Sequence, residues 1–307
     1  MTDSSPASFD PKQFYDGLIA HGLIVSGGVL GAFGRGAVFE DVLERFNRII
    51  TEIAKDDGAE VYTFPPVIDR TILERVDYLD SFPQLAGCVH SFFGKEKEAR
   101  ELSERIHAHQ PWGELMGQTA VVLNPAACYP VYPSLAGQLP RKGRLVTMTN
   151  WVYRHEPSIE PTRMQAFRVR EFVRAGSPDD VVEWRDMWLQ RGLDLLQALG
   201  LPARSDVASD PFFGRAGKML QSGQKAQKLK FEVLVPVISL EDPTAVCSFN
   251  YHQTHFGDVF GIRQHDGEVA HTSCLGFGLE RVVMALFKTH GFDPGSWPQA
   301  VRSRLWP

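Results

Sequence analysis

The sequence contains no long apolar segment and no targeting signal. Its most apolar stretch, residues 23–33, is short and interrupted by glycines, whereas a membrane-spanning helix needs about 20 consecutive apolar residues. The first six residues offer neither the basic region nor the apolar region of a secretion signal. We therefore expect a protein that is not secreted and has no membrane partner.

Cysteine is also scarce. The 307 residues include four cysteines, and no two of them form a C-x-x-C pair. Their spacing is not that of a disulfide framework, so a reducing, cytoplasmic location is expected. The four are Cys88, Cys128, Cys247 and Cys274.

No block of basic residues is present, and the net charge is −5. A protein that holds a large folded RNA through its phosphates needs many cations, so we expect no tRNA partner. The glycine-rich segment 27–36 lacks the G-K-[ST] ending of a phosphate-binding loop and the G-x-G-x-x-G order of a dinucleotide site. We interpret it as a turn-rich approach to a helix.

The pattern of apolar residues predicts the main elements. Apolar side chains at three- and four-residue intervals indicate a helix over 38–53, and a strand with two prolines follows at 60–68. Residues 70–120 look mainly helical, with a solvated charged stretch at 95–105. Further strands are predicted at 145–153, 166–173, 231–235 and 245–251, and further helices at 178–199 and after Arg281.

Short turns, rather than regular crossover helices, separate these strands. We therefore expect an α+β fold with an antiparallel sheet flanked by helices. Residues 1–24 are expected to be a loose lead-in, and residues 25–307 a single catalytic domain.

Two arginine-centred segments carry the chemical signal. The first holds Arg154 and Glu156, which lie on one face of a strand because side chains alternate; it is followed by the return strand Arg168–Phe172. The second, Gly276–Arg281, reads G-x-G-x-E-R and opens a helix. Alone, the first pattern is also typical of a surface ion pair, and the second of a surface arginine after a turn. Together and in this order they resemble motifs 2 and 3 of the class II aminoacyl-tRNA synthetases.

This resemblance implies a site for ATP. Arg154 would steady the α-phosphate, and Arg281 would hold the outer phosphates together with Glu232 and Mg²⁺. Arg168 would belong to the same nucleotide site, and Phe172 would stack on the adenine. Glu156 would orient the adenine or the substrate amine. The return strand has a second possible register, Arg163–Phe167; we prefer Arg168–Phe172, which leaves Arg163 in a loop near the outer phosphates.

Cysteine and glutamate near these motifs suggest a metal. Taken singly, Cys128 and Cys274 are more often inert core residues. Cys128, Glu171 and Cys274 together, however, look like the zinc set of the atypical, methanogen-type seryl-tRNA synthetases. The resemblance implies one Zn²⁺ per subunit with a fourth position open for substrate.

The departure from those synthetases is equally informative. About 35 residues precede the first predicted helix, and no long helical arm for tRNA is present. The chain is therefore similar to the amino acid:[carrier protein] ligases, which resemble a synthetase core without its RNA-binding part. The resemblance implies that glycine, or alanine, is activated with ATP and passed to the phosphopantetheine thiol of a carrier protein.

Three further expectations follow from the resemblance. The helix and the proline-containing strand at 38–68 resemble motif 1, the dimerisation element, and imply a homodimer. A basic patch should meet an acidic carrier protein, and the helix at 181–200 with Arg185 and Arg191 is a candidate for it. Two alternatives remain: a minimal tRNA synthetase, and a degenerate synthetase that acts as a binding module.

Overall fold

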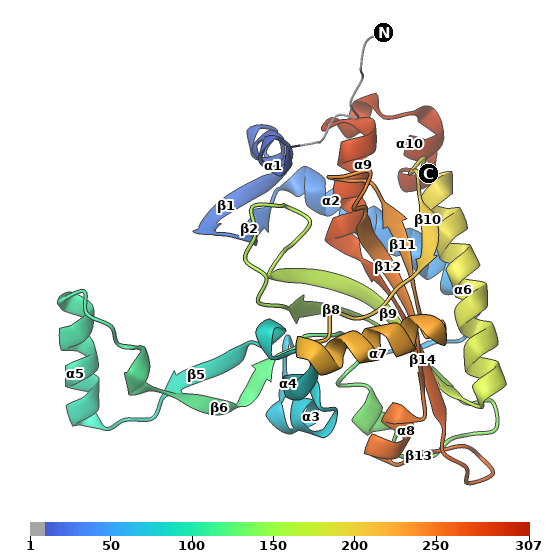
Figure 1. Cartoon of the computed structure of the whole chain (residues 1–307). Coiled ribbons are helices and arrows are strands. Elements are labelled where there is room, and N and C mark those ends of the chain that lie inside the picture. Colours follow the sequence, from blue (N-terminus) through green and yellow to red (C-terminus); the bar gives the residue numbers. More distant parts are fainter. Residues whose placement is uncertain (1–9) are drawn as a thin grey trace.

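A seven-stranded sheet forms the centre of the computed structural model, which describes residues 10–307 (Figure 1). Its strand pairs are antiparallel except for one short parallel pair at the edge, β3–β8. This confirms the expected antiparallel sheet flanked by helices. The order across the sheet is β10 (Arg204–Val207), β11 (Lys230–Val235), β12 (Thr244–Gln253), β14 (His271–Gly278), β9 (Ala166–Gly176), β8 (Arg144–Tyr153) and β3 (Glu60–Val61).

Long helices cover one face of this sheet. Helix α6 begins where predicted, with Ser177 as its N-cap and proline in the first turn. Its Trp188 packs against Phe172 of β9, at a centroid distance of 5.0 Å. The apolar stripe of α2 is buried in the same core, where Phe46 meets Phe277. The helices on this side are α2 (Ala37–Ala54), α6 (Pro178–Ala198), α9 (Leu279–His290) and α10 (Gln299–Leu305).

The N-terminal segment differs from the expectation of a loose lead-in. Residues Pro11–Ala20 form helix α1, which buries Phe14 and Leu18. The glycine-rich segment leads into helix α2, whose N-cap is Gly36, as expected, but it also forms a hairpin of β1 (Ile24–Val29) and β2 (Ala32–Arg35) that was not predicted. Its glycines serve the turn, because Gly28 and Gly31 have φ angles of 75° and 71°, which glycine adopts without strain. The part of the lead-in before residue 10 lies outside the described residues.

Residues 60–123 were only partly predicted. The proline-containing strand is two strands, β3 in the large sheet and β4 (Val67–Asp69) in a small sheet with β6 (Met116–Leu123) and β5 (Cys88–Phe92). Pro65 and Pro66 lie between them and have no N–H to continue a ladder. The short helices α3 (Arg70–Arg75) and α4 (Tyr78–Ser81) follow β4.

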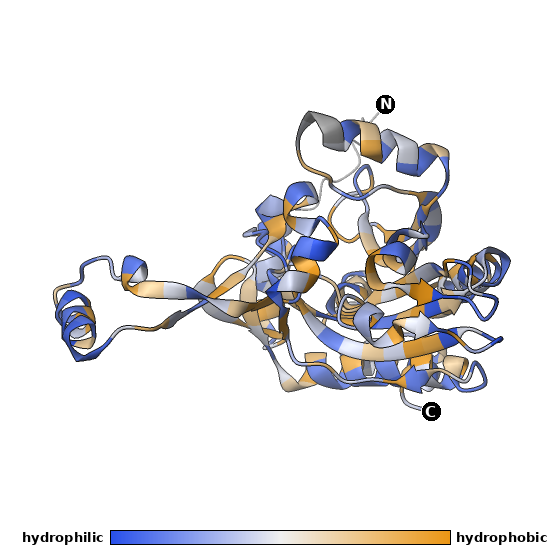
Figure 2. Ribbon diagram, turned by 90° about the horizontal axis from the view of Figure 1, so that it is seen from below, coloured by the Kyte–Doolittle hydropathy of each residue, from blue (hydrophilic) through white to orange (hydrophobic). Residues whose placement is uncertain are grey.

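The ribbon of β5 and β6 projects from the body and carries α5 (Glu96–His107) at its tip (Figure 1). No residue of α5 is buried, which confirms the prediction of a solvated charged helix, and Figure 2 shows it as mainly hydrophilic. The expectation of a mostly helical stretch over 70–120 is confirmed, but it missed the two ribbon strands, which bury only Val122 and so lack a clear apolar alternation.

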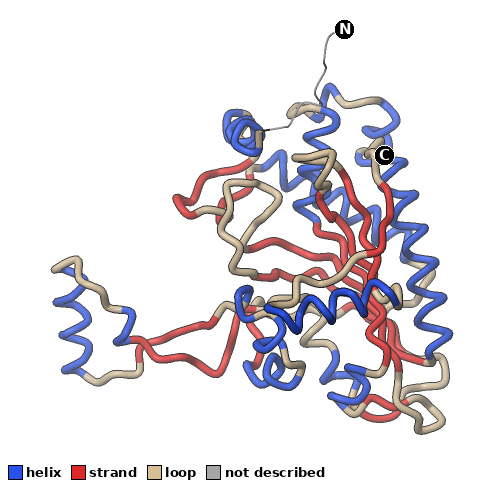
Figure 3. Tube along the Cα trace, viewed as in Figure 1, coloured by secondary structure: helices blue, strands red, loops and turns tan. Residues whose placement is uncertain are grey.

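Smaller elements cover the other face of the sheet, as Figure 3 shows for the helix α7 (Gly214–Ala226) that crosses it. Helix α8 (His255–Phe260) and the parallel pair β7 (Gly137–Gln138) and β13 (Ile262–Arg263) lie near one end of this face. Within the described part of the chain, no helix has both the length and the apolar character needed to cross a bilayer.

Candidate active site

A cavity of about 520 Å³, the main cavity, lies against the face of the sheet that α7 crosses. Alternate residues of β9 and β14 line it, because side chains alternate between the two faces of a sheet, and β12 contributes both alternate and neighbouring residues. These floor residues are Phe167, Val169 and Glu171 of β9, Cys274, Gly276 and Gly278 of β14, and Ser248 and Asn250 of β12.

Two arginines converge at one end of the main cavity. Arg154 follows β8 and donates from Nε to the carbonyl oxygen of Pro125, at 3.2 Å. Arg281, in the first turn of α9, donates to the carbonyl oxygens of Thr162 (2.9 Å) and Ala245 (3.0 Å). Burial, and then the charge of Arg154, lower the pKa of Arg281 to about 10. Two partly desolvated cations held side by side form a site for an anionic ligand.

The aromatic ring at this end is Phe167, not Phe172. The Arg154 and Arg281 guanidinium carbons lie 5.8 and 5.5 Å from the centre of the Phe167 ring. Phe172 is fully buried on the opposite face, against Trp188. The preferred register, Arg168–Phe172, therefore named the wrong aromatic residue. The alternative register, Arg163–Phe167, names Phe167, which lines the cavity.

Arg168 also lies away from the main cavity. Its guanidinium makes two hydrogen bonds to the carboxylate of Glu40, at 2.7 and 2.8 Å, and its Nε donates to Glu280 at 3.0 Å. Strand alternation again gives the reason, because Arg168 and Glu171 project from opposite faces of β9. Arg168 is therefore not in the nucleotide site as predicted. It connects α2, β9 and the start of α9 instead.

Three other predicted residues lie near the arginine end. Glu232 and Arg281 line both the main cavity and a second cavity of about 550 Å³, which the exposed side chain of Arg163 also lines. Arg163 pairs with Glu160 at 3.2 Å. Glu156 lines neither cavity, but its negative charge acts on Arg281; its role stays a prediction.

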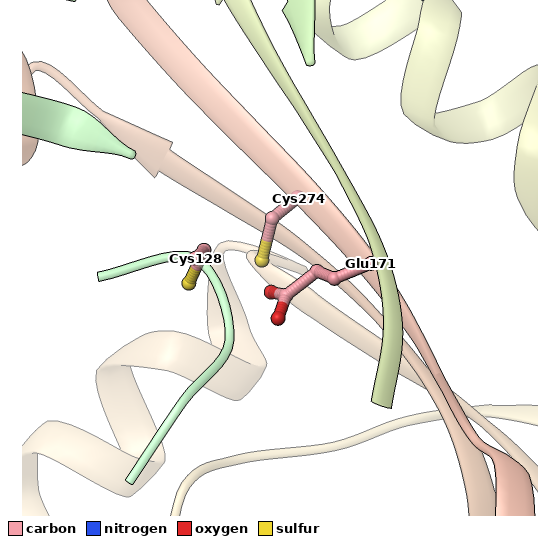
Figure 4. Close-up of side chains that lie close together, drawn as sticks. All are labelled: Cys128, Glu171 and Cys274. Atoms are coloured by element: carbon pink, nitrogen blue, oxygen red, sulfur yellow. The ribbon is translucent and has the colours of Figure 1, made fainter. Parts of the chain in front are cut away.

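Cys128, Glu171 and Cys274 meet deeper in the main cavity and form what we call the Cys–Glu–Cys cluster. Their ligand atoms all lie within 4.8 Å of one another, and Figure 4 shows the side chains directed toward a common point. Cys128 comes from the loop after β6, whereas Glu171 and Cys274 come from the paired strands β9 and β14. Asn250 donates to the Cys274 sulfur at 3.3 Å.

The electrostatics of the cluster favour a cation. The hydrogen bond with Cys274, then burial, raise the pKa of Cys128 well above its usual range, and burial raises the pKa of Glu171. The hydrogen bond from Cys128 lowers the pKa of Cys274, but burial and Glu171 outweigh it. Three buried acids without a cation are thus held toward their neutral forms. Two sulfurs and a carboxylate are ligands that Zn²⁺ accepts, and the residues fit such an ion.

The structure adds residues that the sequence reasoning missed. Asp210, Lys230 and His252 all line the main cavity. His252 packs its ring edge against Phe256 and places Nε2 3.5 Å from the Cys274 sulfur. Burial lowers the pKa of His252 to about 3, so it is neutral. The one available signal was alternation along β12, where His252 shares a face with Asn250.

Helix α6, which was expected to carry a basic docking patch, does not present Arg185 and Arg191 as free surface cations. Arg185 is buried on α6, where it pairs with Asp186 at 2.7 Å and donates to the carbonyl oxygen of Lys228 at 3.1 Å. Arg191 pairs with Asp57 at 3.0 Å. Helix α6 also covers the face of the sheet opposite the main cavity, so this candidate was wrong.

Comparison with solved structures places the fold. The chain superposes on the Methanopyrus kandleri seryl-tRNA synthetase, solved in complex with A. aeolicus tRNASec. The TM-score is 0.81 at 22% identity, over 99% of this chain and 62% of the other. A prolyl-tRNA synthetase from Cryptosporidium parvum gives a TM-score of 0.66 at 14% identity, over 91% and 51% of the two chains. The protein therefore has the class II aminoacyl-tRNA synthetase catalytic fold.

Comparison of sequences places the family. No protein-family model matches the chain. The type-2 serine–tRNA ligase of Methanopyrus kandleri is 27% identical over 294 residues, and the match spans 88% of this chain but 54% of that enzyme. Amino acid–[acyl-carrier-protein] ligases 1 and 2 of Bradyrhizobium diazoefficiens are each 44% identical over 305 residues, which are 99% of this chain and 92% and 90% of theirs. The chain belongs to the amino acid–[acyl-carrier-protein] ligases, and it is an enzyme of the ligase class.

Proposed function

We propose that the protein activates a small amino acid with ATP and transfers the aminoacyl group to the phosphopantetheine thiol of a carrier protein. One observation carries the proposal: a single cavity holds the Arg154–Arg281 pair at one end and the Cys–Glu–Cys cluster further in. A cationic end suits a nucleotide phosphate, and a metal-binding end suits an amine. The names of the Bradyrhizobium relatives support the carrier protein as acceptor.

The arginine end would perform the adenylation. Arg154 would stabilise the charge that develops on the α-phosphate when the amino acid carboxylate attacks it, and pyrophosphate would leave. Arg281 and Glu232 would hold the outer phosphates with Mg²⁺, with Arg163 at the exposed side of the second cavity. Phe167 takes the place of Phe172 as the ring that would stack on the adenine.

The cluster would select the amino acid. Cys128, Glu171 and Cys274 would hold one Zn²⁺, which when bound supplies a Lewis acid that favours the deprotonated amine over a hydroxyl group. His252 contacts Cys274 and is fixed by Thr272, whose Oγ1 lies 3.1 Å from the histidine Nδ1. This rigid ring fills space beside the cluster, which supports a small substrate, glycine or alanine.

Helix α7 is the element that we propose for carrier docking in place of α6. Leu220 is exposed and also lines the main cavity, so the cavity opens beside this helix. Lys218 and Lys225 are exposed on α7, and so is Met219. Basic and apolar side chains next to the opening suit an acidic carrier protein that inserts a flexible thiol arm.

The function is tested by the choice of acceptor. The enzyme is incubated with ATP, Mg²⁺ and labelled glycine, together with holo-carrier protein, apo-carrier protein or total tRNA. We expect label on the holo form alone, because only its thiol can attack the aminoacyl-adenylate. Label on tRNA would favour the minimal synthetase, and label on the apo form at an equal rate would contradict the thiol as acceptor. No exchange of ATP and pyrophosphate with any amino acid would favour the degenerate synthetase.

We also propose a homodimer. The apolar stripe of α2 does not support it, because the core of the same chain buries that stripe; exposed apolar residues elsewhere do. Val61 of the edge strand β3 is 78% exposed, and Val25 and Leu30 of the β1–β2 hairpin are 59% and 54% exposed. Light scattering at micromolar concentration is expected to give the mass of two chains, and Val61→Glu the mass of one, because a charge at the edge disfavours pairing. A monomeric wild type would contradict this.

A further inference from the structure

An ionic network around the buried Lys230 joins β11 to α7 along the wall of the main cavity. The Nζ atom of Lys230 lies 2.6 Å from Oδ1 of Asp210 and 3.0 Å from Oε1 of Glu232. The other carboxylate oxygen of Asp210 accepts from the side chain of Gln224 in α7 at 2.8 Å, and the Asp210 N–H donates to the Gln224 amide oxygen at 2.7 Å. All four side chains line the cavity.

The network is charged although Lys230 is buried and its carboxylate partners are only partly exposed. Burial alone would lower the pKa of Lys230, but the charges of Asp210 and Glu232 outweigh it and raise that pKa. Burial would likewise raise the pKa of Asp210, but Lys230 outweighs it and lowers that pKa. Lys230 and Asp210 are therefore both ionised near neutral pH. Buried ion pairs contribute little net stability compared with apolar residues of the same size, so stability gives no sufficient reason for this arrangement.

The position of Lys230 links the two ends of the site. In the sheet Lys230 lies opposite Asn250, which lies opposite Cys274 of the cluster. Glu232 lies opposite Ser248, nearer the end where it shares the cavity wall with Arg281. The backbone of Lys230 is thus level with the amino-acid end, and its ammonium contacts Glu232, the acid that we assign to the nucleotide end.

The same network anchors α7, which has few other anchors. Among the α7 residues whose burial the structure describes, Gly217 is the one that is buried. Met219 and Leu220 are exposed. At its N-terminal side the Phe213 N–H donates to the carbonyl oxygen of Ser81 at 2.9 Å. The paired hydrogen bonds between Gln224 and Asp210 hold the last turn of α7 against the cavity.

We propose that Lys230 is a positioning residue for both half-reactions. On one side it orients the Glu232 carboxylate for the nucleotide. On the other side it fixes Asp210, and through Asp210 and Gln224 it holds α7 at the opening where the carrier thiol enters. The inference rests on the proposed function, and it predicts that the two sides of the network can be separated by mutation.

The test measures both half-reactions in the full-length enzyme. Adenylation is followed by ATP–pyrophosphate exchange, with kcat and the KM for ATP, and transfer by single-turnover reaction of preformed aminoacyl-adenylate with holo-carrier protein. Gln224→Ala is expected to leave exchange within about twofold of wild type and to slow transfer about tenfold, because it releases α7 alone. Lys230→Met is expected to slow both steps by about 10–100-fold, since a displaced group near the reacting atoms costs this much.

Two further variants show whether Lys230 positions the reacting groups or only stabilises the fold. Lys230→Arg keeps the charge and is expected to recover more exchange than transfer, because the longer fork can still pair with Glu232 but displaces Asp210. Lys228→Met, at an exposed lysine two residues away, should match wild type in both assays. Transfer at the wild-type rate in Gln224→Ala, or equal losses of exchange and transfer in that variant, would overturn the inference. The proposed function fails separately, if the wild-type enzyme performs neither half-reaction.

Discussion

Arg154→Ala is expected to lower the rate of ATP–pyrophosphate exchange by about 10²–10³-fold, which corresponds to a loss of about 2.7–4 kcal/mol of transition-state stabilisation. The side chain is held by the Pro125 carbonyl and stands over Phe167, so it is already in place before a ligand arrives. In the proposed reaction its charge would be needed most when negative charge builds on the α-phosphate. The loss should therefore appear in kcat as well as in kcat/KM.

The control for this prediction is an arginine outside the cavity. Arg204→Ala removes a side chain that is 57% exposed and pairs with Asp206 at the surface, and it is expected to exchange pyrophosphate at the wild-type rate. Arg154→Lys should recover little activity, because an ammonium lacks the planar fork that binds two phosphate oxygens at once. Exchange by Arg154→Ala at the wild-type rate would remove this residue from the reaction.

Local patterns predicted much of the architecture. The helices α2, α6 and α9 and the strands β8, β9, β11 and β12 follow from apolar periodicity and from the cap at Ser177. The apolar residues of these elements pack into the core, so their patterns are clear. The β5–β6 ribbon buries only Val122, so its strands show no clear apolar face. Its strands form because they pair with each other, which no local pattern shows.

The wrong register of the return strand had a signal in the sequence. Glu171 was assigned to the metal and Phe172 to the adenine, yet neighbouring residues of a strand point to opposite faces. Both could not line one cavity. The alternative with Phe167 satisfies alternation, because Phe167, Val169 and Glu171 share a face. Testing each motif against strand alternation would have selected it.

The residues around Lys230 had no such signal. Asp210 and Gln224 approach Lys230 only because the chain between β10 and β11 turns back over the cavity as α7. A lysine between a glutamate and a distant aspartate is usually a solvated surface group. Its burial depends on tertiary packing that distant residues create, and so it could not be read from spacing. The residues of the Cys–Glu–Cys cluster are also far apart in the sequence, and they were predicted only from the family resemblance.

Cys274→Ser is expected to remove bound zinc and to lower amino-acid-dependent exchange by about 100-fold or more, since disturbing even the partners of metal ligands costs 10–100-fold. Serine keeps the size of the side chain but is a much poorer ligand than a thiolate. Elemental analysis should give about one zinc per chain for the wild type and much less for the variant. Cys88→Ser, at the exposed cysteine of β5, should keep both zinc and activity.

The two readouts together decide what the cluster does. Loss of zinc with loss of exchange supports a metal that binds the substrate amine, and the proposed site then also predicts that hydroxy acids are not activated by the wild type. Loss of zinc with unchanged exchange would place the metal outside amino acid recognition. Active wild-type protein without zinc would refute the metal altogether. Because the cluster lies in the cavity that also holds Arg154 and Arg281, a metal there would lie close to the substrate that we propose, and the first outcome is the one that we expect.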